Sequence, residues 1–186
     1  METINKIRKF YHLKNVDRAG PVGERRESAA EHSWSCLILA DYFLNLIQDK
    51  DIDRLKVYEL LIYHDVVEIE TGDIPIHHEE ERKNKQQDEL KALELIKEEI
   101  PQNLKDKFVK LFTEFEDCET KEAKLAKAID ALDAMIHFLD YKESWKGWTE
   151  EMVRKFHGSK MGSFKETQEV FEKIVEYAKG QGFFEQ

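Results

Sequence analysis

Four ionisable residues lie inside apolar stretches of the sequence: His32, the adjacent pair His64-Asp65, and Asp130. An imidazole or a carboxylate in such surroundings is costly unless it is paired, hydrogen-bonded or bound to a metal ion. Two imidazoles and two carboxylates form a mixed nitrogen and oxygen ligand set, which suits one divalent transition metal (Mn, Co, Fe, Ni or Zn) and suits Ca poorly. The sequence therefore predicts a metal centre whose ligands are His32, His64, Asp65 and Asp130.

Two further carboxylates follow the His64-Asp65 pair. Glu68 lies three residues after Asp65, so on a continuous helix its side chain shares a face with the pair. Asp73 follows Gly72, where that helix should end. Carboxylates beside a Lewis acid can transfer protons during hydrolysis. Glu68 and Asp73 are therefore candidate catalytic residues, and the sequence leaves open which is the acid and which the base.

The spacing of apolar residues predicts the helices that carry these side chains. Ser28 and Glu31 match a capping box for one helix, and Asp53 and Thr120 are expected to cap two others. The helix from Asp53 should continue to about residue 69. The segment 15–27, with its Gly and Pro residues, is expected to be a loop. Other helices are expected over residues 4–13, over 79–99, in a short stretch after Pro101, and over 164–178.

Composition favours one all-α domain. Of the 186 residues, 37% are charged and only 3 are proline, which suits long amphipathic helices better than many short strands. The net charge of −10 argues against nucleic acid as the partner. No apolar stretch approaches the roughly 20 residues of a membrane span, and the two cysteines form no disulfide framework. We therefore expect a cytoplasmic protein.

The candidate residues sit in three strings that resemble the HD-domain phosphohydrolases, and more narrowly their 5′-deoxynucleotidase branch. The likeness runs from about Leu13 to about Tyr141. The long middle string is far more specific than a lone His-Asp doublet. The strings are Glu31-His32-Ser33, Tyr63-His64-Asp65-x-x-Glu68-x-x-Thr71-Gly72-Asp73-x-Pro75, and Lys127-x-x-Asp130-Ala131-Leu132.

This resemblance implies a single HD-type helical bundle over residues 1–186, with its core at about 13–141 and the C-terminal helices completing it. It implies the same four metal ligands, catalytic roles for the positions of Glu68 and Asp73, and a homodimer. The implied reaction is attack of a metal-bound water on (deoxy)ribonucleoside 5′-monophosphates, with release of phosphate.

The stretch Leu13-Lys14-Asn15-Val16-Asp17-Arg18 resembles the family segment that carries a phosphate-orienting arginine. A guanidinium can grip two phosphate oxygens at once, so Arg18 is a candidate catalytic and substrate-binding residue. The bacterial branch has tryptophan after this arginine, whereas this chain has Ala19, which leaves ribose and deoxyribose both open. The full set of implied substrate contacts is Arg18, Ala19, His32, Asp65, Asp73, Ile74, Pro75, Ile76 and Asp130.

Two other functions remain open on sequence alone. One is an HD hydrolase of another phosphate bond, such as a cyclic phosphodiester, a nucleoside triphosphate or guanosine tetraphosphate. The other is a non-catalytic helical binding module. The remaining histidines and tryptophans are interpreted as ordinary polar or packing residues: His12, His77, His78, His137, His157, Trp145 and Trp148.

Overall fold

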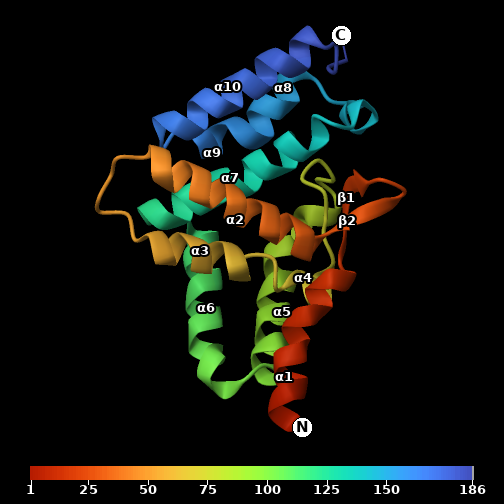
Figure 1. The fold of residues 1–186 in the computed structure, drawn as a ribbon. Helices are drawn as coiled ribbons and strands as arrows, with labels where there is room; N and C mark the ends of the chain where they lie inside the picture. Colours follow the sequence, from red (N-terminus) through yellow and green to blue (C-terminus); the bar gives the residue numbers. More distant parts are fainter. Residues whose placement is uncertain (186) are drawn as a thin grey trace.

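The computed structural model describes residues 1–185 and consists of helices with one small hairpin (Figure 1). The predicted all-α class is confirmed. The principal helices are α1 (Glu2–Tyr11), α2 (Ala29–Leu46), α3 (Arg54–Tyr63), α5 (Lys85–Glu99), α6 (Gln102–Asp117), α7 (Lys121–Phe138) and α10 (Lys165–Gly180). Three short helices complete the set: α4 (Glu68–Thr71), α8 (Glu150–Val153) and α9 (Ser159–Met161).

The starts of three core helices are set by side-chain caps. Ser28 and Glu31 form the predicted capping box at α2. Asp53 and Thr120 each accept a hydrogen bond from the backbone N–H three residues later, at the starts of α3 and α7. Each cap satisfies a backbone donor that a helix N-terminus leaves without a partner. These three predictions are confirmed.

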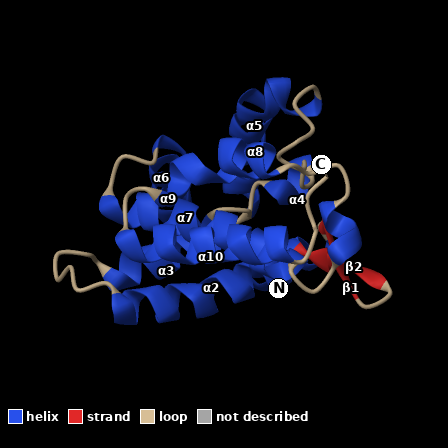
Figure 2. Ribbon diagram, turned by 90° about the horizontal axis from the view of Figure 1, so that it is seen from above, coloured by secondary structure: helices blue, strands red, loops and turns tan. Residues whose placement is uncertain are grey.

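Helix α7 lies at the centre of the bundle. It packs against α2, α3, α6 and α10, and Figure 2 shows α2, α3, α7 and α10 running alongside one another. Leu125, Ile129 and Leu132 on α7 have no exposed surface. Any polar group that α7 carries on this inward side is therefore held rigidly among packed apolar side chains.

The segment predicted as a loop is a β-hairpin, so that prediction was wrong. Strands β1 (Asp17–Val22) and β2 (Arg25–Ser28) pair antiparallel beside the start of α2. Gly23 makes the turn with a positive φ of 60°, and Gly20 lies where a Cβ atom would come within 2.8 Å of the His137 ring. The glycines that exclude a helix are the ones that a tight hairpin against α7 requires.

The predicted helix over residues 53–69 is interrupted, which is a second correction. Helix α3 ends at Tyr63, residues 64–67 form turns, and α4 begins at Glu68. Gly72 ends α4 with a φ of 73°, as predicted. The His64-Asp65 pair therefore lies on a turn between two helices. The shared helix face inferred for Glu68 does not exist, although Glu68 still lies beside the pair.

The chain after α7 contains structure that the sequence did not predict. A 3₁₀ turn (Lys142–Trp145), α8, a π-helical turn (Arg154–Gly158) and α9 precede α10. Helix α9 packs against α7. Helix α6, expected to be short, has 16 residues. Within residues 1–185, no helix combines the length and apolar character needed to cross a membrane.

Candidate active site

The four predicted metal ligands converge at one point. His32 comes from α2, His64 and Asp65 from the turn after α3, and Asp130 from α7. The Nε2 atoms of His32 and His64 are 3.4 Å apart. His32 Nε2 lies 3.2 Å from Asp130 Oδ1 and 3.7 Å from Asp65 Oδ2, and His64 Nε2 lies 3.2 Å from Asp65 Oδ1. Residues nearly 100 positions apart in the chain thus share one small volume.

These separations fit a divalent metal ion. Metal–ligand bonds of about 2.0 to 2.2 Å place neighbouring ligand atoms of one ion roughly 3.0 to 3.5 Å apart. The separations among the imidazole nitrogens and aspartate oxygens lie in or close to that range. The side chains of His32, His64 and Asp65 are buried or nearly so, which suits a held ion better than a hydrated ion pair.

The orientation of each imidazole ring is fixed by a hydrogen bond at its Nδ1 atom. His32 Nδ1 lies 2.6 Å from Asp133 Oδ2, and His64 Nδ1 lies 2.8 Å from the Leu61 carbonyl oxygen. With a metal ion bound, donation from each Nδ1–H would leave a lone pair on each Nε2 facing the cluster, which is the form of the ring that binds a metal. Asp133 was missed by the sequence analysis. Its position three residues after Asp130, on the same side of α7, was the signal available.

Cys36 also lies at this point. Its Sγ is 3.6 Å from His32 Nε2, and ligand atoms of His32, Cys36 and His64 all lie within 4.8 Å of one another. Burial raises the pKa of the Cys36 thiol to about 12. Without a metal ion this thiol keeps its proton, whereas Asp130 and Asp65 each bring a carboxylate oxygen to 3.2 Å from an imidazole nitrogen, and the choice of the carboxylates as ligands rests on that geometry.

The two aspartates are held in the ionised form. Burial by itself would raise the pKa of Asp130, but the hydrogen bond from His32 and the charge of Lys160 outweigh it, and the pKa falls well below its usual value. The pKa of Asp65 is also lowered, because His64, His32 and Arg18 outweigh its burial. The cluster therefore offers negative charge to a cation at neutral pH.

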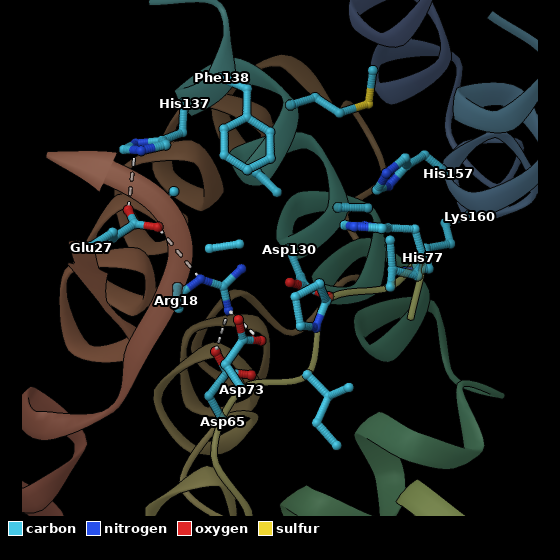
Figure 3. Close-up of a pocket in the computed structure, with 18 of the residues that line it drawn as sticks. Arg18, Glu27, Asp65, Asp73, His77, Asp130, His137, Phe138, His157 and Lys160 are labelled. Atoms are coloured by element: carbon cyan, nitrogen blue, oxygen red, sulfur yellow. Dashed lines mark hydrogen bonds and ion pairs between the residues drawn. The ribbon is translucent and has the colours of Figure 1, made fainter. Parts of the chain in front are cut away.

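Arg18 projects from β1 toward the cluster and lies among carboxylates (Figure 3). Its Nη1 is 3.4 Å from Asp65 Oδ2 and 3.8 Å from Asp73 Oδ1, and its Nε is 3.4 Å from Glu27 Oε2. Burial opposes its charge, but Asp65 and Asp73 raise its pKa above the usual value, so Arg18 stays a cation. Glu27 on β2 is a second residue that the sequence analysis did not single out.

Glu68 is buried beside the cluster, with 6% of its surface exposed. Among the described residues its Oε2 atom has no hydrogen-bond partner. Burial, together with the negative charges of Asp65 and Asp73, raises its pKa well above the usual value. A buried carboxyl group whose pKa is raised toward neutrality is suited to acid–base chemistry.

A cavity of about 280 Å³ opens over these residues. Its size is near the lower end of pockets that hold small ligands. Of the predicted substrate contacts, His32 does not line the cavity, because its side chain is fully buried. The predicted contacts that do line it are Arg18, Ala19, Asp65, Asp73, Ile74, Pro75, Ile76 and Asp130.

The cavity wall also includes residues that the sequence analysis treated as ordinary. The cavity is lined by all five of them, so their interpretation as ordinary polar or packing residues was incomplete: His77, His137, His157, Trp145 and Trp148. Trp145 is a packing residue as well as part of the cavity wall, since it is buried in the core and donates a 2.8 Å hydrogen bond to the Phe138 carbonyl oxygen. Three cationic side chains of the wall were missed, Arg82, Lys85 and Lys160, and Lys127 of the third sequence string lines the cavity as well.

Comparison with known proteins identifies the family. The sequence matches the HD domain family over residues 10–172. The chain belongs to this family. It is 29% identical to the 5′-deoxynucleotidase HDDC2 of Xenopus laevis over 156 residues, which are 82% of this chain and 75% of that protein. It is 26% identical to human 5′-deoxynucleotidase HDDC2 over 113 residues, 59% of this chain and 53% of that one.

Solved structures agree with the assignment. The fold is similar to the crystal structure of a predicted metal-dependent phosphohydrolase from Magnetospirillum magnetotacticum MS-1, with a TM-score of 0.88 and 27% identity. The similarity covers 100% of this chain and 95% of that one. The HD family predicted from the three sequence strings, with its helical bundle, is therefore confirmed.

The ligand assignment predicts that His64→Ala or Asp65→Ala abolishes metal binding and leaves the helix content unchanged. Metal content of the purified proteins by elemental analysis, with circular dichroism for folding, measures this. Cys36→Ser is the matched control, because its side chain touches His32 but is not assigned as a ligand. Full metal content in Asp65→Ala, or its loss in Cys36→Ser, would contradict the assignment.

The role of Asp133 predicts that Asp133→Ala weakens metal binding by about 10- to 100-fold, because His32 then loses the partner that fixes its ring and tautomer. Asp133→Asn, which keeps an acceptor oxygen, should lose less. Titration calorimetry with Mn²⁺ gives the affinities. Asp140→Asn, an exposed change just beyond α7, is the control. Equal affinities for Asp133→Ala and the wild type would show that Asp133 has no such role.

Proposed function

We propose that this chain is a metal-dependent phosphohydrolase that releases phosphate from ribo- and deoxyribonucleoside 5′-monophosphates. The observation that carries the proposal is the meeting of two imidazoles and two ionised aspartates with Arg18 and Glu68 at one cavity. The HDDC2 relatives are named as 5′-deoxynucleotidases, which supports the substrate class. We further propose that residues 1–186 form one HD domain, with its core at about 13–141.

His32, His64, Asp65 and Asp130 would hold one divalent transition metal, chosen among Mn, Co, Fe, Ni and Zn. When bound, such an ion lowers the pKa of a coordinated water and polarises a phosphate oxygen. The protein's own side chains bind the phosphate and transfer the protons. Arg18 binds phosphate oxygens and stabilises the charge that builds on them, while its neighbours Glu27 and Asp73 fix its direction.

Glu68 and Asp73 move the protons of the reaction. One takes the proton of the attacking water, and the other supplies a proton to the leaving 5′-oxygen. Glu68 Oε2 is buried without a hydrogen-bond partner among residues 1–185, so it is free to hold a proton or pass it on. Phosphate monoester hydrolysis is among the slowest uncatalysed reactions, so cation, arginine and carboxylates must act together.

The residue next to Arg18 at the cavity edge affects whether ribose or deoxyribose is preferred. Ala19 is exposed there, where the bacterial branch has tryptophan. A methyl group presents no large surface against the 2′-position of the sugar. We therefore propose that ribose and deoxyribose are both accepted.

We propose that the protein is a homodimer joined through α2. Four large apolar side chains lie four residues apart along this helix and are exposed by 64%, 55%, 52% and 43%: Trp34, Ile38, Tyr42 and Leu46. A continuous exposed apolar stripe is typical of an interaction surface. Sedimentation analysis should give twice the chain mass of 22.0 kDa; a monomer at micromolar concentration would refute the dimer.

We also propose a cytoplasmic location with no nucleic-acid or membrane partner. Both cysteines are free, and the net charge is −10. Free thiols suit a reducing compartment, and a strongly negative chain repels phosphate backbones. A fluorescent fusion seen at a membrane or nucleoid would contradict this.

The proposed activity is tested by assaying free phosphate and pyrophosphate from a panel of nucleotides with each candidate metal. The panel contains ribo- and deoxyribonucleoside monophosphates, triphosphates, cyclic nucleotides and guanosine tetraphosphate. We expect free phosphate from the monophosphates and no pyrophosphate. Pyrophosphate release or cyclic phosphodiester cleavage would favour another HD hydrolase, and no turnover with metal bound would favour a binding module.

The role of Glu68 predicts that Glu68→Gln keeps the metal and lowers kcat by about 100- to 10,000-fold, the usual contribution of one general acid or base. Steady-state kinetics and elemental analysis measure the two effects. Glu70→Gln is the matched control, since Glu70 lies on the same short helix but is exposed and paired with Lys9. Unchanged kcat in Glu68→Gln would remove Glu68 from the mechanism.

A further inference from the structure

One cation in the cavity wall lies on the side away from Arg18. Lys160 is on α9, which follows the π-helical turn and packs against α7. Figure 3 shows Lys160 and His157 at one side of the cavity and Arg18 at the other, with Asp130 between them. A ligand that reaches Asp130 is therefore approached by positive charge from two sides.

The cations of the wall differ in how they are compensated. Arg18 lies within 4 Å of three carboxylates, those of Glu27, Asp65 and Asp73. Lys85 and Lys127 are each paired with one carboxylate, from Glu89 and Glu116 respectively. Among the residues that the structure describes, Lys160 has no carboxylate oxygen within 4.0 Å. The guanidinium of Arg82 likewise has none and donates a 2.6 Å hydrogen bond to the Ile74 carbonyl oxygen.

Lys160 therefore concentrates uncompensated charge at its end of the cavity. Burial lowers the pKa of Lys160, and the nearby cations Lys127, Arg82 and Lys85 lower it further, whereas the carboxylate of Asp130 opposes this shift. His157, three residues before it, adds no charge at neutral pH, because burial and the nearby Lys160 lower its pKa to about 4. A half-buried cation without a partner gains most from an anion that enters the cavity.

We propose that Lys160 is a second phosphate-binding residue, whose ammonium group contacts the substrate's phosphate oxygens from the side opposite Arg18. This inference rests on the proposed function and deepens it. Two positive groups on opposite sides fix the position of a phosphate better than one does. If the phosphate moves toward either group, its contact with the other group lengthens. Arg18, already surrounded by carboxylates, orients the phosphate. Lys160 supplies the net attraction.

The test is equilibrium binding of inorganic phosphate to the Mn²⁺-loaded protein by titration calorimetry, with kinetics on a nucleoside monophosphate alongside. Lys160→Met, which keeps the apolar stem, should weaken phosphate binding by roughly 10- to 100-fold, the usual effect of losing a charge-assisted hydrogen bond. KM should rise by a similar factor while metal content and melting temperature stay unchanged. Lys160→Arg should restore most of the affinity. Lys160→Gln gives a second neutral variant.

Lys155→Met is the matched control, because Lys155 lies on the preceding turn, is exposed and pairs with Glu79. It should bind phosphate as the wild type does. Wild-type phosphate affinity and KM in both neutral Lys160 variants would overturn the role of Lys160 and leave the proposed function intact. A wild-type protein that neither binds phosphate nor turns over any monophosphate would refute the proposed function, and this inference with it.

Discussion

The structure depends on keeping two aspartate charges and two imidazoles together in a bundle interior. Asp65, Asp130, His32 and His64 come from three separate elements, and the His32 and His64 Nε2 atoms lie 3.2–3.7 Å from one another and from oxygens of the two aspartates. Ionised carboxylates removed from water are costly unless cations compensate them. Arg18 meets part of this requirement on one side and Lys160 on the other, and a bound metal ion would meet the rest. The buried carboxylates therefore require the positively charged groups that surround them.

The packing of the bundle holds these groups together. Helix α7 lies at the centre of the core and carries both Asp130 and Asp133, so one packed helix supplies a proposed ligand and the carboxylate that orients the His32 ring. The break after α3 serves the same end, because a turn lets His64 donate to the Leu61 carbonyl oxygen while its other nitrogen faces His32. The packing of α7 and the turn after α3 therefore fix the positions of the side chains in the site.

Sequence reasoning succeeded where the determining interaction is local. The caps of α2, α3 and α7 depend on residues three positions apart, and all three were predicted. The HD family was also predicted, because its strings join spacing with unusual buried polar residues. The turn at residues 64–67 was missed because apolar periodicity continues through it. The hairpin was missed because glycine and proline indicate a turn but do not show that its two arms pair.

The missed site residues depend on long-range packing. In the sequence, Asp133 does not differ from an ordinary helix aspartate. Its role becomes visible only in the fold, where α2 places His32 Nδ1 2.6 Å from Asp133 Oδ2. His157 and Lys160 line the cavity only because the segment after α7 folds back over that helix. No local spacing encodes such a return of the chain. Predicting this half of the cavity would have required the tertiary structure, whereas the metal-binding half is already indicated by its residues.

The most direct test of the central claim is anomalous X-ray diffraction from crystals grown with Mn²⁺. The account predicts one peak within about 2.0 to 2.3 Å of His32 Nε2, His64 Nε2 and an oxygen each of Asp65 and Asp130. A crystal that holds Mn²⁺ elsewhere, or that shows the ion bound to Cys36 while Asp65 and Asp130 point away, would contradict it.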